Sequence, residues 1–316
     1  MRIEKISTLE KLIEVRGEWN TLLESSSQNC VFLSNEWFCA WFESFGESYP
    51  LCVLLFRDHK NRLFGAAPLM ETCEGQKFIA SQEVTDYCDF IVERGKEELF
   101  YINFLEYWQK ENWQNSPLLL ENIREGSPTL SILSRMADEH QLENSVRESD
   151  VALSLDLPLT YEEYLKNLVR KNRHELQRKK RKIDSLSGVF HKRVNDPVGV
   201  RNYIDLFIDM HGKRSSSKRK FWHKKGMVEF FRTITALFSE NGWIEFNAVH
   251  FQDEPAAILL NFIYHDEIHF YNIAFEPKYS PFSPGIYLFN QSIRQAIEDK
   301  LRRADFLRGR EKYKYY

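Results

Sequence analysis

Apolar residues recur at helical spacing in four stretches of the first half of the chain. The spacing predicts helices over 9–25, 34–46, 96–112 and 127–140. Ser34 or Asn35 supplies the N-cap of the second of these helices. Between the helices, residues 51–70 form two apolar runs around a polar turn at Asp58–Asn61, which is typical of a β-hairpin, and 117–123 indicates a short buried strand.

The second half begins with a long helical pattern over residues 161–186. Its middle, Gln177–Lys182, has no apolar residue, so this turn must be solvated or face a partner. A further helix ends at Gly242. Residues 243–275 then predict three antiparallel strands, with turns at Gln252–Glu254 and His265–Glu267. A helix opening near Gly285 and a strand over 302–309 complete the pattern.

Both halves thus follow one plan of helices, an antiparallel hairpin, a helix and a strand, which indicates a structural duplication without a residue-level repeat. The expected fold class is α/β (α+β), with two tandem domains whose mixed, largely antiparallel sheets are flanked by helices. The domain boundary is expected at 150–160, which divides the chain into residues 1–155 and 156–316.

Charge is distributed unevenly over the 316 residues. Residues 1–150 carry 14 Lys and Arg against 26 Asp and Glu, whereas the remainder carries 29 against 20. The basic half is therefore expected to meet an anion, such as a nucleotide cofactor, RNA or an anionic membrane. The alternative is that the two halves simply attract each other.

Several function classes lack support. No apolar run is long enough to span a membrane, and the start lacks the pattern of a signal peptide. The five cysteines form no CxxC pair, which favours reduced, mostly buried thiols in the cytoplasm. The sequence HDEIH at 265–269 spans a turn and a strand, so we expect no metal site there, and P-loop, Rossmann and hydrolase motifs are missing.

A stiff turn near the end of the chain is the main candidate for phosphate binding. SPFSPGIYLFNQ, residues 280–291, places two prolines and Gly285 between a strand and a helix. Unpaired N–H groups at a helix N-terminus attract phosphates, and glycine permits close backbone approach. We expect Ser283, Gly285, Ile286 and Tyr287 to hold a pyrophosphate; the alternative is an ordinary strand-to-helix turn.

Five segments together resemble the bacterial CelD-like, FemAB-related branch of the GNAT acyltransferases, which has tandem GNAT-like domains. They are FLSNEWFCAWFESFG with RLFGAAPLM, VRKNRHELQRKKRKI, MHGKRSSSKRKFW, AFEPKYSPFSPGIYL and DFLRGREKYK. They span nearly the whole chain in the same order. The turn departs from the family pattern, because only Gly285 stands where a basic residue and two glycines are usual.

The resemblance implies an acyltransferase that uses acetyl-CoA or another acyl-CoA and no metal, with a second, catalytic domain and a degenerate first domain that shapes the acceptor site. Cofactor contacts would come from the turn and from Ile273, Ala274 and Phe275, whose strand would present an oxyanion donor. An amine or hydroxyl acceptor, a small molecule or a cell-envelope component, also needs a base. The candidates are Glu311, Asp305 and His211, with Tyr287 as the proton donor to the thiolate.

Basic residues define the remaining expectations. Arg308 and Lys314 would lie with Glu311 near the substrate end of the cleft, although a solvated basic terminus explains them equally. Arg173, Arg214 and Lys220 belong to the basic 170–225 region, whose three serines at 215–217 suggest a mobile loop. That region could bind tRNA or an anionic membrane from the cytoplasmic face. The alternatives to the acyl-CoA enzyme are an aminoacyl-tRNA-dependent FemAB-type transferase and a non-catalytic GNAT-fold binding module.

Overall fold

The computed structural model describes residues 1–80, 84–111, 113, 117–311 and 314. The chain forms two compact units, Met1–Ser149 and Asp150–Tyr316. The second unit begins at Asp150, at the start of the expected 150–160 region, because strand β7 (Ala152–Asp156) pairs with the last strand of the chain.

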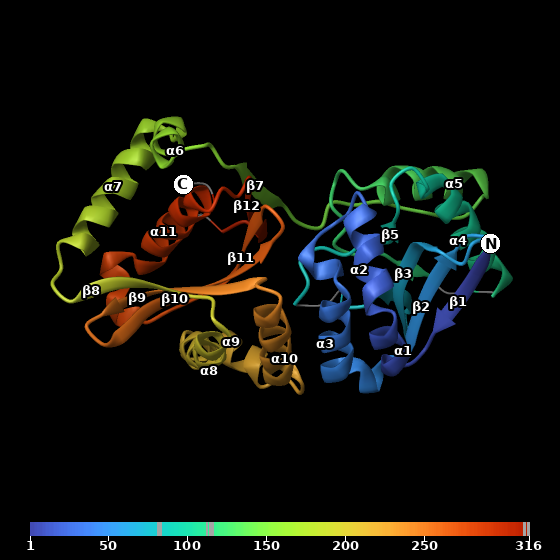
Figure 1. The fold of residues 1–316 in the computed structure, drawn as a ribbon, viewed down its shortest axis with the longest axis horizontal. Coiled ribbons are helices and arrows are strands. Elements are labelled where there is room, and N and C mark those ends of the chain that lie inside the picture. The colour runs from blue at the N-terminus through green and yellow to red at the C-terminus, as the bar shows by residue number, and fades with distance from the viewer. Residues whose placement is uncertain (81–83, 112, 114–116, 312–313, 315–316) are drawn as a thin grey trace. The chain divides into compact units, whose positions relative to one another are not determined.

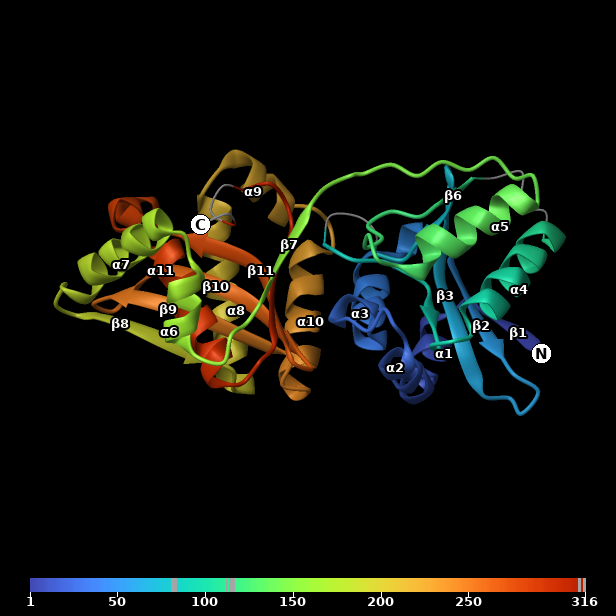
Figure 2. The same cartoon turned by 90° about the horizontal axis from the view of Figure 1, so that it is seen from above.

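The first unit is built on a sheet with the order β1-β2-β3-β4-β6, to which β5 adds by pairing with β3. Helices α1, α2 and α3 lie on one face of this sheet and α4 and α5 on the other (Figures 1 and 2). The strands are β1 (Arg2–Ile6), β2 (Leu51–Arg57), β3 (Leu63–Thr72), β4 (Gly75–Phe78), β5 (Ile91–Val92) and β6 (Leu118–Leu119). The helices are α1 (Leu9–Glu14), α2 (Arg16–Ser25), α3 (Asn35–Phe45), α4 (Glu97–Lys110) and α5 (Ser134–Glu139).

The second unit has the strand order β7-β12-β11-β10-β9-β8. Helices α6, α7 and α11 cover one face of this sheet, and α8, α9 and α10 cover the other (Figures 1 and 2). The strands after β7 are β8 (Val189–Val194), β9 (Ile244–Phe251), β10 (Glu254–Tyr264), β11 (Glu267–Phe275) and β12 (Arg303–Arg308). The helices are α6 (Tyr161–Asn167), α7 (Arg170–Asp184), α8 (Pro197–Lys213), α9 (Ser216–Trp222), α10 (Met227–Glu240) and α11 (Pro284–Glu298).

The two units repeat one topology. Strands β1, β2, β3, β4 and β6 of the first correspond in order and direction to β8, β9, β10, β11 and β12 of the second. In each unit the first three pairings are antiparallel and the last is parallel, β4 with β6 and β11 with β12. Three helices follow the first strand, and one helix, α4 or α11, precedes the parallel strand. The predicted fold class, two mixed, largely antiparallel sheets flanked by helices, is confirmed.

The predicted helix over 161–186 is wrong as a single element. Leu168 and Val169 adopt extended backbone angles, so α6 ends at Asn167 and α7 begins at Arg170. The Arg173 guanidinium donates to the carbonyl oxygens of Leu165 and Lys166, at 3.4 and 3.5 Å, and thereby satisfies the end of α6.

Other local predictions also need correction. The three serines do not form a loop: Ser215 is the N-cap of α9, and its hydroxyl accepts the Lys218 N–H. Residues 127–140 begin with a π-helical turn, Thr129–Leu133, before α5. The strand expected at 117–123 is only the half-buried pair of β6. Ser34, Asp58–Asn61 and Gly242 stand where expected, at a cap, a hairpin turn and a helix end.

Each unit has its own apolar core. In the first, Phe100, Tyr101 and Phe104 of α4 pack against the aromatic side chains of Phe56 and Phe90. In the second, Leu288, Ile293 and Ala296 of α11 pack onto the sheet.

All five cysteines are free, and Cys73 is exposed. Among the described residues, no helix combines the length and the apolar character needed to cross a bilayer.

Candidate active site

The two parallel strands of the second unit separate partway along their length. β11 and β12 are in register at Glu267/Arg303, Ile268/Ala304 and His269/Asp305, and their pairing stops there. Beyond this point the edge of β11 that faces β12 is no longer used by the ladder, so its backbone donors can meet a ligand.

A bulge and a bend accompany the separation. On β11, Phe270 lies opposite Asn261 and Asn272 lies opposite Leu260, which leaves Tyr271 as the extra residue of a β-bulge. On β12, Leu307 adopts φ 58°, and its N–H donates to Asp305 Oδ1 at 2.7 Å. Asp305 therefore holds the bend that turns β12 away from β11.

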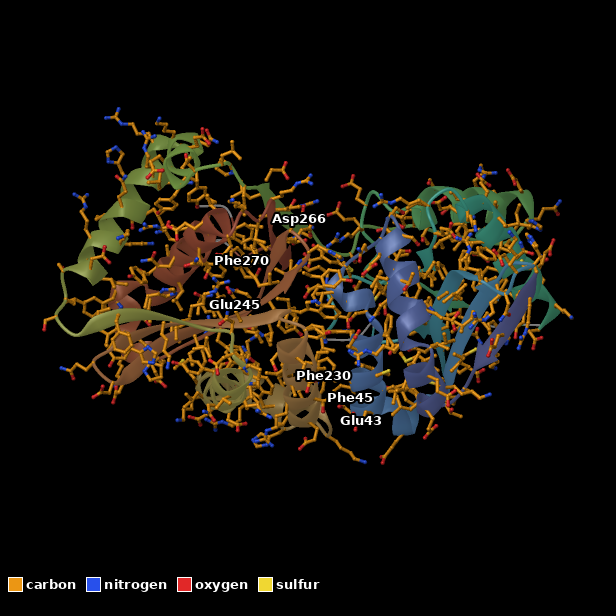
Figure 3. The ribbon with its side chains drawn as sticks, viewed as in Figure 1. Glu43, Phe45, Phe230, Glu245, Asp266 and Phe270 are labelled. Carbon is orange, nitrogen blue, oxygen red and sulfur yellow. The ribbon has the colours of Figure 1, made fainter. Side chains whose placement is uncertain are left out.

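Aromatic rings line the opening on the α11 side. Phe270 of β11 contacts Phe289 of α11 and Phe306 of β12, with ring centroids 5.2 and 5.0 Å apart. Figure 3 labels Phe270, which lies between the sheet and α11. The opening thus has an apolar lining, beside which hydrogen bonds to a developing charge are stronger than in water.

A groove between α6–α7 and α11 continues from this opening. Its apolar lining comes from the α6–α7 segment, from α11 and from β12: Leu168, Leu176, Ile286, Phe289, Ile293 and Phe306. Polar side chains at its rim are Asn172, Glu175, Lys179 and Lys314. Phe306 and Lys314 mark the end next to the separated strands, and Ile286 belongs to the first turn of α11.

The first turn of α11 has the features of an anion site. Ser283, the N-cap, has left-handed angles (φ 54°, ψ 52°), and Pro284 follows it. No acidic residue lies in this first turn. A Cβ on Gly285 would come within 3.0 Å of Ile273 Cδ1, so glycine permits the close approach of the turn to β11.

Lys182 of α7 brings a positive charge to the same turn. Its Nζ donates to the Pro281 carbonyl oxygen at 2.9 Å and lies 5.0 Å from the centre of the Phe282 ring. The turn has one glycine where two are usual, and a side chain from another helix adds the charge instead. This contact is not evident from the sequence, because Lys182 and Pro281 are far apart in the chain.

His211 lies buried at the end of α8. Its Nδ1 accepts the Trp222 indole N–H at 2.9 Å, and its ring stacks on Phe207. Burial, with the nearby cations Lys218 and Arg214, lowers the pKa of His211 to about 3. The ring is therefore neutral at pH 7, and because Nδ1 accepts a hydrogen bond, its proton lies on Nε2. The expected role of His211 as a general base stays a prediction.

Charged side chains gather near the C-terminal end of β11. The Arg214 guanidinium lies 4.3 Å from the centre of the Phe275 ring. Burial lowers the pKa of Lys218, the charge of Arg214 lowers it further, and Glu311 raises it. Glu311 also pairs with Lys314 at 3.0 Å. The structure thus brings His211, Arg214, Phe275 and Glu311 into one region.

Other predicted residues lie elsewhere in the unit. The Tyr287 hydroxyl donates to Asp184 of α7 at 3.3 Å, and burial raises the pKa of Tyr287. Arg173 caps α6, and Lys220 is exposed on α9. Lys314 Nζ donates to the carbonyl oxygens of Leu307 and Arg308, at 3.3 and 2.6 Å, so it supports the bent end of β12.

One group of three metal-type ligands occurs in the described part of the chain. Glu267, His269 and Asp305 have ligand atoms within 4.8 Å of one another. The Arg303 guanidinium lies 3.9 Å from Glu267 and opposes a divalent cation there. His269 lies between the two carboxylates, 3.8 Å from Glu267 and 4.0 Å from Asp305. The HDEIH stretch supplies Glu267 and His269, and Asp305 joins them through the pairing of β11 with β12.

Comparison with known proteins shows which family model the second unit matches. Residues 170–315 match the model of the acetyltransferase (GNAT) domain. No curated protein sequence matches the chain significantly.

Solved structures share the fold of the whole chain. FemX is similar with a TM-score of 0.60 and 12% identity, covering 99% of this chain and 90% of its own. L-PGS from Bacillus licheniformis has a TM-score of 0.55 and 12% identity, with coverages of 92% and 75%. The C-terminal domain of a putative lysylphosphatidylglycerol synthetase from Agrobacterium fabrum has a TM-score of 0.55 and 11% identity, with coverages of 96% and 79%.

These matches confirm the resemblance seen in the sequence. At such low identity the structures establish the fold, while the family model identifies the second unit. The second unit therefore belongs to the GNAT acetyltransferase family and is an acyltransferase domain, within a chain that has the FemX-like, tandem GNAT fold.

Proposed function

We propose that the protein transfers an acyl group, acetyl or longer, from acyl-CoA to an amine or hydroxyl of a cell-envelope component. One observation carries this proposal. The β11–β12 separation opens into a groove that leads to an acid-free helix N-terminus carrying Lys182. A thioester, a flexible arm and a pyrophosphate need these three environments in this order.

The donor would lie along the groove with its phosphates at the first turn of α11. Backbone N–H groups of Gly285 and Ile286, the Ser283 hydroxyl and Lys182 would hold the phosphates. The arm would cross Ile286 and Phe289 towards Phe306. The thioester carbonyl would then meet the β11 edge, where the Ile273 N–H donates to the Asn272 side chain at 2.9 Å, an acceptor that a carbonyl oxygen can replace.

The chemistry would proceed by direct attack. The acceptor nitrogen or oxygen forms a bond to the carbonyl carbon, the carbon–sulfur bond breaks, and the acceptor proton leaves. Glu311 is the proposed base, because it lies beside Lys314 at the end of the groove next to the separated strands. Lys314 would stabilise the departing thiolate there. Tyr287, held by Asp184 at the phosphate end, is less well placed for that role.

The first unit is proposed to shape the acceptor site without binding a donor. The helix of that unit equivalent to α11 is α4, and its first turn carries Glu97 and Glu98. Two carboxylates at a helix N-terminus repel the phosphates that α11 would attract. We place the protein in the bacterial cytoplasm, at the inner face of the membrane when its acceptor is membrane-bound.

Aminoacyl-tRNA is the second candidate donor. The single-glycine turn departs from the usual acyl-CoA pattern, and α7 carries exposed cations that could contact RNA phosphates. The acyl carbon of an aminoacyl ester could use the same opening. The binding of a charged tRNA would depend on the cations of α7 much more strongly than the binding of a CoA thioester would.

Ligand-dependent stabilisation distinguishes the two donors. Wild-type protein is heated with CoA, acetyl-CoA, a long-chain acyl-CoA or charged tRNA, since a ligand that binds the native state raises the unfolding temperature. Gly285→Glu is expected to weaken CoA binding at least about tenfold, equivalent to about 1.4 kcal/mol. Gly17→Glu is the matched control, because nothing lies within 4 Å of a Cβ at that position.

The outcomes are separate. A shift with CoA compounds that Gly285→Glu abolishes and Gly17→Glu retains supports the acyl-CoA enzyme. A shift with charged tRNA alone supports the aminoacyl transferase. No shift with any of these donors would leave the non-catalytic binding module as the better explanation.

A further inference from the structure

One face of α7 is an exposed row of cations. Its solvent-facing positions recur at helical spacing and are Arg170, Lys171, His174, Arg178, Arg181 and Lys182, here called the basic stripe. The opposite face carries Leu176 and Ile183, which pack towards α11. The stripe spans about 18 Å along the helix.

Few carboxylates neutralise the basic stripe. Glu175 pairs with Arg178 at 2.7 Å and with Lys179 at 3.5 Å, and Asp184 pairs with Lys180. Among the described residues, Arg170, Lys171 and Arg181 have no carboxylate within 4.0 Å. Clustered cations without nearby carboxylates create a positive potential that attracts a polyanion. Cations that are each paired with a carboxylate create a much weaker one.

Exposed aliphatic side chains flank α6, the short helix that precedes the basic stripe. Val169, immediately before α7, is 69% exposed, and Leu159, just before α6, is 91% exposed. Val169 lies beside the cations that begin α7, whereas Leu159 lies at the opposite end of the short helix α6. Exposed aliphatic side chains next to cations favour a lipid surface, into which they can insert.

We propose that the α6–α7 segment docks the second unit on an anionic phospholipid bilayer. The stripe cations from Arg170 to Arg181 contact the headgroup phosphates, while Lys182 stays at the first turn of α11. Leu159 and Val169 enter the interface below the headgroups. This deepens the proposed membrane-face location, but it does not depend on acyl transfer. RNA is the competing polyanion; the stripe offers it no exposed Phe, Tyr or Trp ring for base stacking, and its one imidazole is that of His174.

Vesicle sedimentation tests the proposal with the full chain. The protein is mixed at low salt with vesicles of phosphatidylglycerol and phosphatidylcholine in equal amounts, or of phosphatidylcholine alone. Binding is expected only with the anionic vesicles and is expected to fall as salt is raised. Replacing Arg170, Lys171, Arg178 and Arg181 by Gln is expected to lower the affinity about a hundredfold or more.

Two further variants separate the contributions of charge and apolar insertion. The control replaces Arg201, Arg294, Lys300 and Arg302 by Gln; these residues are exposed, lie outside α7 and change the net charge equally. It is expected to retain most of the binding. Leu159→Ser with Val169→Ser is expected to weaken vesicle binding about tenfold while leaving any binding of total tRNA unchanged.

Three results would overturn the proposal. The first is a lack of binding to the anionic vesicles, and the second is an equal loss of vesicle affinity in the α7 variant and in the charge control. The third is tighter binding of tRNA than of vesicles, with vesicle binding unaffected by the Leu159 and Val169 changes. The last result would assign the basic stripe to RNA. Failure of acyl-CoA binding, by contrast, would leave the vesicle result unaffected.

Discussion

Two buried titratable side chains, one in each unit, have pKa values that are shifted in opposite directions. Burial raises the pKa of Asp89 to about 6, although Ser127 and Thr129 donate hydroxyl hydrogen bonds to its carboxylate. Burial and neighbouring cations lower the pKa of His211 to about 3. In both cases the neutral form is favoured in the folded state.

The second unit is expected to lose stability in acid through His211. Its folded pKa lies below the ordinary value of 6.5, so its contribution is present above pH 6.5 and is lost as the pH falls towards 3. His211→Phe should flatten this dependence and cost about 1–3 kcal/mol at pH 7, because the Trp222 N–H loses its acceptor. Urea unfolding at several pH values measures both effects.

The control for this prediction is His223→Phe, because His223 is an exposed histidine of the same unit, at the C-cap of α9. It should leave the pH dependence of the wild type in place. An unchanged acid sensitivity in His211→Phe would show that another group is responsible.

Asp89 is expected to act in the opposite direction in the first unit. Its folded pKa is raised from 3.8, so its contribution to stability is present below pH 3.8 and is lost as the pH rises through 6. Asp89→Asn should remove this loss, and its unfolding temperature should exceed that of the wild type at pH 7 by more than at pH 5. Glu125→Gln, at an exposed position, is the control and should show no such pH-dependent difference.

At the scale of the elements, the break between α6 and α7 creates the groove. A continuous helix over 161–186 would keep one axis, whereas the extended pair Leu168–Val169 lets α7 take its own direction against α11. Leu168 then lines the groove together with Leu176. Arg173 stabilises the break, so a residue expected to contact phosphate has a structural contact with α6.

Filling the groove from α7 is expected to block the donor. Asn172→Trp places a large ring between α7 and α11 and should weaken CoA binding at least about tenfold, with little loss of stability because Asn172 is only half-buried. Lys171→Trp is the matched control on the exposed face of the same helix. Isothermal titration calorimetry compares the CoA affinities of the two variants. Equal affinities would show that the donor does not bind in the groove.

At the scale of the whole molecule, two units of equal topology carry different surfaces. The acidic first half has Glu97 and Glu98 at the helix terminus where the second has Pro284 and Gly285. Duplication of a fold therefore need not duplicate a site. The extra strand β7 also belongs to the second unit alone, where it covers the outer edge of β12.

β7 is expected to set the smallest fragment that folds as the second unit. A fragment of residues 150–316 retains the β7–β12 pairing and the Gly309 N–H bond to Val151 O. A fragment of residues 157–316 exposes the edge of β12 and should be unstable or aggregate. Circular dichroism and size-exclusion chromatography compare them; equal folding of both fragments would contradict this role of β7.

Local and periodic features could be predicted from the sequence because they depend on near neighbours. The helix beginning at Ser34, the hairpin at Asp58–Asn61 and the strands between Gly242 and Phe275 follow from caps, turns and apolar period. The turn at Gly285 was also located correctly, since proline and glycine mark it directly in the sequence. The repeated order of elements was enough to indicate the duplication.

Only the tertiary structure decided how distant residues meet at the site. The Tyr271 bulge, the bend at Leu307, the approach of Lys182 to Pro281 and the burial of His211 depend on strand pairing and helix packing across the chain. No local signal encodes such contacts, because each depends on partners far away in the sequence. The sequence by itself therefore determined most of the elements and the family resemblance, while packing decided which side chains face the groove and which lie buried away from it.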